Sequence, residues 1–341
     1  MGSFIAYASR RKGLIVSGVA VATAAGVAAA VIPAVADSGS RGGGGTEIAV
    51  QHGGHSGAGA LFGGAGTGRG GTILAASLNG ADEVPVKGGP AVGDKDGAAL
   101  EFVRIKGEKV SVAVTWRGTD RPSALHIHQG GKGVNGGIKV DFTKLIKKYG
   151  KSRSLTGTVE VKDAALLKKL RNDPASFYAN LHTAQFPGGA VRGQFHKVTT
   201  DFDFRYALRN FQASVLKGKQ IYECKKAEGG GYAFAQRDVA AVLGGGIAHS
   251  FVKPGSGTPQ WIAPDRSAVT GSLISKSPNG DRNIPELDLK AKQSGKHRGL
   301  LADTAEILRL NTVGGVAPAG SCSPGAIVGV PYKADYVFIN R

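Results

Sequence analysis

The sequence predicts an all-β protein with two β-sandwich-like or barrel-like domains, placed after a signal peptide and a glycine-rich linker. Short runs in which apolar and polar residues alternate recur from residue 72 to the C-terminus. Clusters of Gly, Pro and Asn separate these runs, and Gly accounts for 54 of the 341 residues without a G-X-Y period. A hydrophobic content of 41% argues against wholesale disorder, which leaves a turn-rich β protein.

Residues 1–36 are predicted to be a signal peptide. Basic residues 10–12 precede an apolar run over 14–32, and Ala34-Val35-Ala36 matches the small-residue rule for cleavage, which we expect after residue 36. A membrane anchor is the alternative, because the run is nearly long enough to span about 30 Å of hydrocarbon. After cleavage no stretch would cross a membrane, so we expect a secreted protein. The arginine pair leaves Sec and twin-arginine export both open.

Residues 37–71 are predicted to be a flexible linker, because their many glycines come with too few apolar residues to offset the entropy of ordering. G-x-G-x-x-G spacings occur at 66–71 and 131–136. Neither leads from a strand into a helix, so no dinucleotide site is expected.

Residues 72–198 are predicted to form the first β-domain. Asn135-Gly136 is a strong hairpin signal, and a helix is expected over 164–171 with Asp163 as its N-cap. Eight short strands at this spacing are typical of a β-sandwich or barrel. The predicted strands are 73–79, 98–104, 110–117, 123–129, 137–142, 156–161, 176–183 and 190–197.

Residues 202–341 are predicted to form a second β-rich domain, with strands at 221–224 and 334–338 near its ends. Cys224 and Cys322 are the only cysteines, which excludes a disulfide-dense scaffold and a four-cysteine zinc site. In an oxidising compartment they are expected to form one disulfide, with a contribution of about 4–5 kcal/mol for a loop of this length. Two free thiols or an intermolecular bridge are the alternatives.

Three predicted strands of the first domain carry polar residues on one face. His126 and His128 are two positions apart, so both imidazoles share a face while Leu125 and Ile127 point into the core. If the strands are neighbours, these imidazoles converge with that of a later strand. The polar face of the later strands offers Asn180 and His182, then Arg192, Gln194 and His196.

These residues lie in segments that resemble the chordin (CHRD) domain. The similarity covers about residues 72–198 and is carried by 78–85, 126–130 and 180–194. In animals the domain belongs to secreted proteins that bind growth factors, and in bacteria it occurs in exported proteins whose activity is mostly unassigned. The resemblance therefore implies a secreted β-domain with a binding role.

The second domain resembles an uncharacterised domain family of secreted bacterial and fungal proteins over about 218–339. No established chemistry comes with this family. The segments that carry the similarity are 222–224, 246–249, Trp261 and 309–315.

The H-I-H triplet is also similar to a strand of copper–zinc superoxide dismutase. This resemblance implies that His126, His128 and His182 are copper ligands, with Arg192 as an anion guide beside the metal. No histidine lies between residues 129 and 181, where bridging and zinc ligands would stand, so at most a copper-only site is implied. The alternative is structural: the imidazoles hydrogen-bond neighbouring strands and fix the 130–137 loop.

Other catalytic signatures are absent from the sequence, which has neither a G-x-S-x-G elbow nor an H-E-x-x-H helix. In the second domain His249, Trp261, Arg309 and Asn311 are candidates to line a pocket. A buried Trp beside a hydrogen-bonded His is the simpler explanation, and an Arg between two Leu in an alternating run more often faces solvent.

The formal net charge of +18 favours anionic partners. Basic residues gather at 147–153, 168–171 and 290–298. We expect an extracellular protein partner or an anionic cell-envelope polymer; a sequence-specific nucleic acid is not expected, because no recognition motif occurs. The sequence thus predicts a secreted, non-enzymatic binding or cell-wall-associated module. A copper-dependent oxidoreductase is the alternative.

Overall fold

A computed structural model describes residues 68–146 and 152–341. The predicted signal peptide, most of the predicted linker and part of the first basic cluster lie outside these residues. The described chain is almost entirely β, which confirms the predicted fold class. Within the described residues, no helix is long and apolar enough to span a bilayer.

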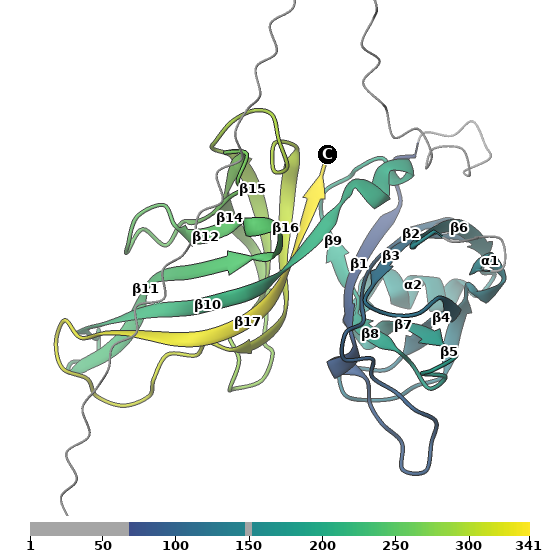
Figure 1. The fold of residues 1–341 in the computed structure, drawn as a ribbon, viewed down its shortest axis with the longest axis horizontal. Coiled ribbons are helices and arrows are strands. Elements are labelled where there is room, and N and C mark those ends of the chain that lie inside the picture. Colours follow the sequence, from purple (N-terminus) through teal and green to yellow (C-terminus); the bar gives the residue numbers. More distant parts are fainter. Residues whose placement is uncertain (1–67, 147–151) are drawn as a thin grey trace, which may run out of the picture. The chain divides into compact units, whose positions relative to one another are not determined.

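Nine strands of the described chain form the first sheet, in the order β5-β4-β7-β8-β1-β2-β3-β6, with β9 paired to β1. The strands pair into one antiparallel sheet that curves around its own core, rather than into the two packed sheets of a sandwich (Figure 1). The strands are β1 (Thr72–Asn79), β2 (Ala98–Lys106), β3 (Lys109–Arg117), β4 (Pro122–Gln129), β5 (Ile138–Asp141), β6 (Ser154–Glu160), β7 (Phe177–Thr183), β8 (Val191–Gln194) and β9 (His196–Val198).

The core of the first sheet follows the predicted alternation. Leu125 and Ile127 of β4 are buried in it, as are Phe177, Ala179 and Leu181 of β7. Two helices add buried residues to this core, α1 (Thr143–Ile146) through Ile146 and α2 (Ala164–Asn172) through Leu167 and Leu170. The second begins as predicted, because the Leu166 amide donates to the Asp163 carboxylate at 2.9 Å.

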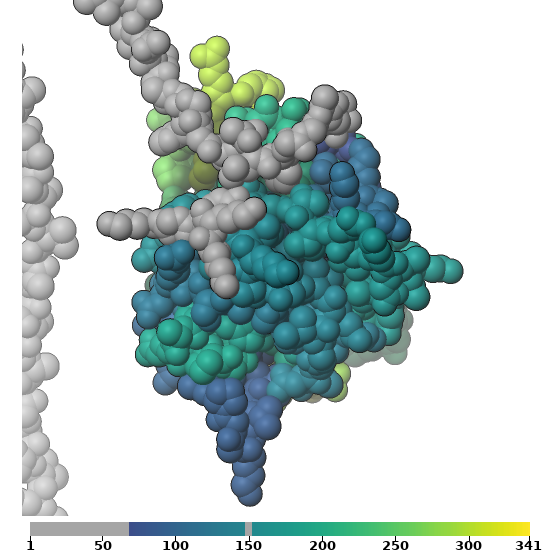
Figure 2. All heavy atoms as spheres, turned by 90° about the vertical axis from the view of Figure 1, so that its right-hand side faces the viewer, coloured from purple at the N-terminus to yellow at the C-terminus, as the bar shows by residue number. Residues whose placement is uncertain are grey.

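The segment between β1 and β2 projects from the first sheet, as the blue chain at the lower end of Figure 2 shows. It begins with a short 3₁₀ turn, Gly80–Asp82, which Asn79 caps. Two of its backbone amides, those of Gly93 and Asp94, donate to the carbonyls of Gly189 and Ala190. The segment is therefore anchored beside the end of β7 and the start of β8.

Eight further strands of the described chain close into a barrel in which each strand pairs with the next along the chain, and β17 pairs back to β10. Cys224 of β10 and Cys322 form a disulfide, as predicted. The strands are β10 (Phe211–Lys226), β11 (Tyr232–Leu243), β12 (Ala248–Phe251), β13 (Pro259–Ile262), β14 (Ala268–Ser277), β15 (Glu286–Gln293), β16 (Thr304–Gly314) and β17 (Ile327–Asn340).

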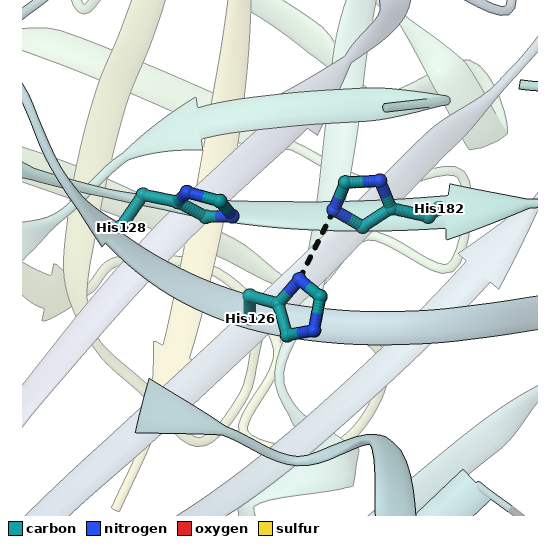
Figure 3. Close-up of side chains that lie close together, drawn as sticks. All are labelled: His126, His128 and His182. Atoms are coloured by element: carbon teal, nitrogen blue, oxygen red, sulfur yellow. Dashed lines mark hydrogen bonds between the residues drawn. The ribbon is translucent and has the colours of Figure 1, made fainter. Parts of the chain in front are cut away.

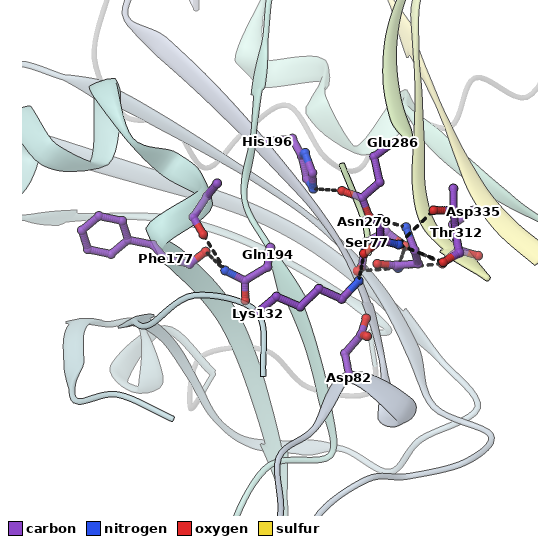
Figure 4. Close-up of polar contacts among 12 residues, drawn as sticks. Ser77, Asp82, Lys132, Phe177, Gln194, His196, Asn279, Glu286, Thr312 and Asp335 are labelled. Atoms are coloured by element: carbon purple, nitrogen blue, oxygen red, sulfur yellow. Dashed lines mark hydrogen bonds and ion pairs between the residues drawn. The ribbon is translucent and has the colours of Figure 1, made fainter. Parts of the chain in front are cut away.

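The sheet and the barrel share a third apolar cluster. Ile73 and Phe102, on the face of the sheet turned away from its own core, lie in one cluster with Leu308 and Val337 of the barrel. Polar contacts surround it: Asn311 of β16 donates to the Ser77 carbonyl at 3.0 Å. Figure 4 shows Ser77 bonded to Asp335 and Lys132 bonded to Asn279 in the same region.

Candidate metal centre

Three histidines of the first sheet meet on one face because β4 and β7 are neighbours. His126 and His128 project from β4, and His182 projects from β7, where it pairs with Ala124. One nitrogen from each ring lies within 4.8 Å of the other two. Figure 3 shows the three rings gathered together, with His126 and His182 joined by a hydrogen bond. The structure therefore brings together the three imidazoles that the two-residue spacing and the strand order predict.

His126 lies between the His182 ring and the Asp141 carboxylate. Its Nδ1 lies 3.2 Å from Nε2 of His182, and its Nε2 lies 3.4 Å from an oxygen of Asp141 on β5. The hydroxyl of Thr143 is 3.2 Å from the same Nε2. Because a carboxylate only accepts, the Asp141 contact favours a proton on Nε2 and a lone pair on Nδ1, whereas in the other tautomer Nδ1 donates to His182 and Nε2 accepts from Thr143.

The other two rings are anchored through Nδ1. His128 Nδ1 lies 2.9 Å from the Gly136 carbonyl, and His182 Nδ1 lies 3.0 Å from the Pro187 carbonyl. A carbonyl accepts, so each Nδ1 carries the proton and donates it. Nε2 of both rings is then the unprotonated nitrogen, and that of His128 is buried without a hydrogen-bond partner among the described residues.

All three rings favour their neutral form. Burial lowers the pKa of His128 and His182 below the usual value, and burial together with the nearby His182 ring lowers the pKa of His126 to about 4. Neutral imidazoles are the form that ligates metal ions. The site therefore presents three lone pairs at neutral pH.

Arg192 supports the loop beside the site. Its side chain is only 1% exposed, and Nη2 donates to the carbonyls of Gly131 and Val134, both at 2.9 Å. Its guanidinium lies 3.5 Å from the centre of the Tyr178 ring, which stacks on His128. The resemblance implies an anion guide at this position, but the guanidinium donors are occupied by the loop and the residue is buried.

The other predicted polar residues divide into two groups. Gln194 donates to the Ala175 carbonyl at 2.8 Å, and Asn180 donates to Glu83 at 3.4 Å, so both lie in the buried polar face of the sheet. His196 is not in the three-histidine group; its Nε2 lies 3.5 Å from Glu286 of the barrel (Figure 4). Its strand pairs with β1 instead of continuing β8 beside β7.

Asp141 and Glu83 are site residues that were not among the predicted ones. Asp141 pairs with His126 across β4 and β5. Because a strand was predicted at 137–142, pairing it with β4 and applying the period of two would have placed Asp141 on the histidine face. Glu83 lies near Asn180, and burial raises its pKa to about 7. Its place in the long segment between β1 and β2 gave no pattern from which to predict this contact.

The residues predicted for a second-domain pocket separate in the structure. His249, Trp261 and Arg309 line one cavity inside the barrel. Asn311 does not line it; its side-chain amide donates to Ser77 and Asp335 outside the barrel. Arg309 faces inward while Leu308 and Leu310 lie in the cluster shared with the sheet, so the expectation that this Arg faces solvent is wrong.

Two family models match the chain, in the order that the sequence predicts. A CHRD domain is found over residues 74–195, and a domain described as a protein of unknown function (DUF3455) is found over residues 240–340. The three histidines lie in the CHRD domain, and the barrel cavity is lined mainly by the second domain. No curated protein and no solved structure is significantly similar to the chain.

Proposed function

We propose that this is a secreted protein whose CHRD domain binds one late first-row transition-metal ion through His126 Nδ1, His128 Nε2 and His182 Nε2. The observation that carries the proposal is that these three nitrogens face one another while the second nitrogen of each ring is already engaged. The site is built from the pairing of β4 and β7, and therefore stands on rigid elements.

Without a bound ion, the tautomer that turns all three lone pairs inward is costly. Nδ1 of His126 and Nε2 of His182 are 3.2 Å apart, and a proton on Nε2 of His126, facing Asp141, leaves both of these nitrogens with lone pairs; a proton on Nδ1 instead makes this contact a hydrogen bond to His182, with Nε2 accepting from Thr143. An added proton would relieve one pair, but the depressed pKa of His126 opposes it. Nε2 of His128 is buried without a partner, which costs about 1–3 kcal/mol in general. A metal ion satisfies all three nitrogens at once.

The surroundings match those of metal-ligating histidines. Such rings ordinarily donate the remaining N–H to a carboxylate, a carbonyl or water, which fixes the tautomer and orientation. Here Asp141 supports His126, while the carbonyls of Gly136 and Pro187 support the other two rings. Each ligand thus has the partner that the chemistry requires.

Neutral imidazole suits copper and zinc, and the general order of affinities among divalent ions favours copper. Only three protein ligands are present in the group, which leaves a coordination position open to solvent or a small molecule. A second metal ion is not proposed, because no carboxylate or further imidazole joins the group within the described residues. An open position permits redox chemistry in a copper-loaded site, and an activity assay would test it separately.

Metal stoichiometry tests this proposal. Purified chain is dialysed to equilibrium against Cu(II) or Zn(II), and bound metal is measured per chain for the native protein, His128→Gln, His182→Gln and His297→Gln. His297 is an exposed histidine of the barrel domain, so its substitution is the matched control. We expect one equivalent of metal in the native and control chains and affinity at least about 100-fold lower in the other two, because each loses a direct ligand. Equal binding by all four chains, or none by the native chain, would refute the proposal.

We further propose that the exported protein associates with an anionic envelope polymer. The support is a surface of exposed cations on the barrel, at Lys290, Lys292, Lys296 and Arg298, together with a disulfide of the kind that persists outside the cytoplasm. Binding to purified cell wall should weaken steeply as salt rises from about 0.05 to 0.5 M, because the Debye screening length shortens as ionic strength rises. Binding that is independent of salt concentration would contradict this part of the proposal.

The mass of the exported chain tests cleavage after residue 36.

A further inference from the structure

The barrel contains a cavity of about 430 Å³. Each barrel strand, from β10 to β17, contributes at least one residue to its lining, so the cavity lies in the interior that the barrel encloses. Eight-stranded barrels have interiors wide enough either to be filled by side chains or to hold one small ligand. The volume is within the range of small-molecule sites, about 300–1,000 Å³.

Arg309 is the one charged residue among those that line the cavity. Its Nη2 donates to the Pro285 carbonyl at 2.8 Å, while its Nε is buried and has no hydrogen-bond partner within the described chain. No carboxylate of the described residues lies within ion-pair distance of its guanidinium. Arg309 is half-buried and also hydrogen-bonds the neutral Tyr336 side chain, so an inward Arg without a carboxylate partner points to an anion from outside the chain.

Two further buried donors around the cavity lack acceptors. Trp261 is 1% exposed and Gln220 is 3% exposed, and neither the indole Nε1 nor the amide Nε2 has a partner in the described structure. The amide oxygen of Gln220 is already used, since it accepts from Gln236 at 2.9 Å. Both residues belong to the cavity wall, in which Arg309 supplies the one positive charge.

The titratable rings of the cavity do not supply a negative charge. His249 stacks on Trp261 with ring centroids 4.4 Å apart, and it donates to the Gln260 carbonyl through Nδ1. Burial lowers the pKa of His249 to about 3, so this ring is neutral. Burial raises the pKa of Tyr336, which therefore keeps its proton. Arg309 remains the uncompensated charge at neutral pH.

The rest of the lining is apolar. Phe251, Leu287 and Leu289 face the cavity, and Leu273, which is 58% exposed, lies at its edge. A ligand that suits these walls has an apolar body that covers them and a single anionic group that faces Arg309. Small aliphatic or aromatic carboxylic acids have this chemistry, and a carboxylate matches the fork of a guanidinium.

We infer that the barrel binds a small apolar carboxylate, with its carboxylate at Arg309 and its apolar body against the leucine side of the cavity. This site is independent of the three histidines, which lie in the other domain. It assigns a binding role to the domain of unknown function.

Calorimetric titration of the full chain with decanoate tests the inference, with decan-1-ol as the uncharged probe of the same length. The variants are Arg309→Gln and Arg298→Gln; Arg298 is an exposed arginine of the same domain and controls for the change in net charge. We expect saturable 1:1 binding of decanoate by the native chain and by R298Q, with affinity at least about 10-fold lower for R309Q and for decan-1-ol, because charge-assisted hydrogen bonds are about twice as strong as neutral ones.

The comparison of decanoate with decan-1-ol on the native chain stands even if R309Q fails to fold. Binding of both probes with equal affinity, equal binding by folded R309Q, or no saturable decanoate binding would each overturn the inference. A change in tryptophan emission on addition of decanoate that is lost in Trp261→Phe, which keeps Trp116, places the probe beside Trp261, and the decanoate concentration needed for it should rise in R309Q.

Discussion

At the scale of single residues, Asp141 shows how a side chain outside the proposed ligand set prepares a ligand. Its carboxylate lies 3.4 Å from Nε2 of His126, which turns Nδ1 toward His128 and His182. An exposed carboxylate on a surface strand would otherwise contribute little. Its role depends on the tautomer that it selects in the neighbouring ring.

Asp141→Asn should lower the affinity of the site for metal by about 10–100-fold while the fold is kept. An amide can donate as well as accept, so it no longer selects one tautomer of His126. Competition with a chelator of known affinity measures the change. Asp281→Asn, at an exposed position of the barrel domain, is the matched control. Unchanged affinity in D141N would mean that Asp141 does not position the ring.

Glu101 is a buried carboxyl inside the core of the first sheet. It is 0% exposed, both of its oxygens lack hydrogen-bond partners within the described residues, and burial raises its pKa to about 8 from an ordinary value of 4.5. The folded chain therefore keeps this proton up to about pH 8, whereas the unfolded chain releases it near pH 4.5. The free energy of unfolding therefore falls as pH rises from about 4.5 to about 8, because only the folded chain holds this proton there.

Glu101→Gln should remove this pH dependence. Between pH 5 and pH 7.5 the free energy of unfolding of the native chain should fall, relative to the variant, by up to about 1.4 kcal/mol per pH unit, the value for one proton. Urea unfolding at several pH values measures the difference. Parallel curves for the two chains would show that Glu101 is ionised in the folded state.

At the scale of elements, the strands and the direction of their side chains were predictable from the sequence. That the 130–137 loop covers the polar face of the sheet was not predictable. The period of two in β4 and β7 placed the histidines and the core residues on opposite faces. That polar face is largely buried, because Arg192 holds the 130–137 loop against it through contacts between residues 57 to 61 positions apart. Local patterns carry no information about such distant pairs.

The disulfide acts on the barrel, since it ties β10 to the segment before β17 across 98 positions of sequence. Its replacement by Cys224→Ser together with Cys322→Ser should lower the free energy of unfolding by about 4–5 kcal/mol in the chain-entropy model. Urea unfolding of the variant beside the oxidised native chain measures the loss. A change below about 1 kcal/mol would show that the unfolded barrel is constrained by other means.

At the scale of the whole described chain, the sheet and the barrel are joined by a shared apolar cluster. Leu308, Leu310 and Val337 of the barrel pack in it with Ile73 and Phe102 of the sheet. The sequence predicted two domains without this contact. The apolar run in β1 was the available signal, because a strand buried on both faces lacks alternation, and the run alone does not name its partner.

This shared cluster should make the sheet and the barrel unfold together. Trp116 lies in the core of the sheet and Trp261 in the core of the barrel, so Trp116→Phe and Trp261→Phe each leave one reporter. We expect the two reporters to give coincident urea transitions, and Leu308→Ala to shift both midpoints downward by the same amount. Separate transitions would show that the two parts fold independently.

The most direct test of the proposed metal site is X-ray absorption spectroscopy of the full chain loaded with one equivalent of Cu(II) or Zn(II). The spectrum should show three imidazole nitrogens at about 2.0–2.1 Å and one further light ligand, with the imidazole count reduced to two in His182→Gln. A spectrum with fewer than two imidazoles in the native chain, or one that His182→Gln leaves unchanged, would contradict the assignment of His126, His128 and His182 as ligands.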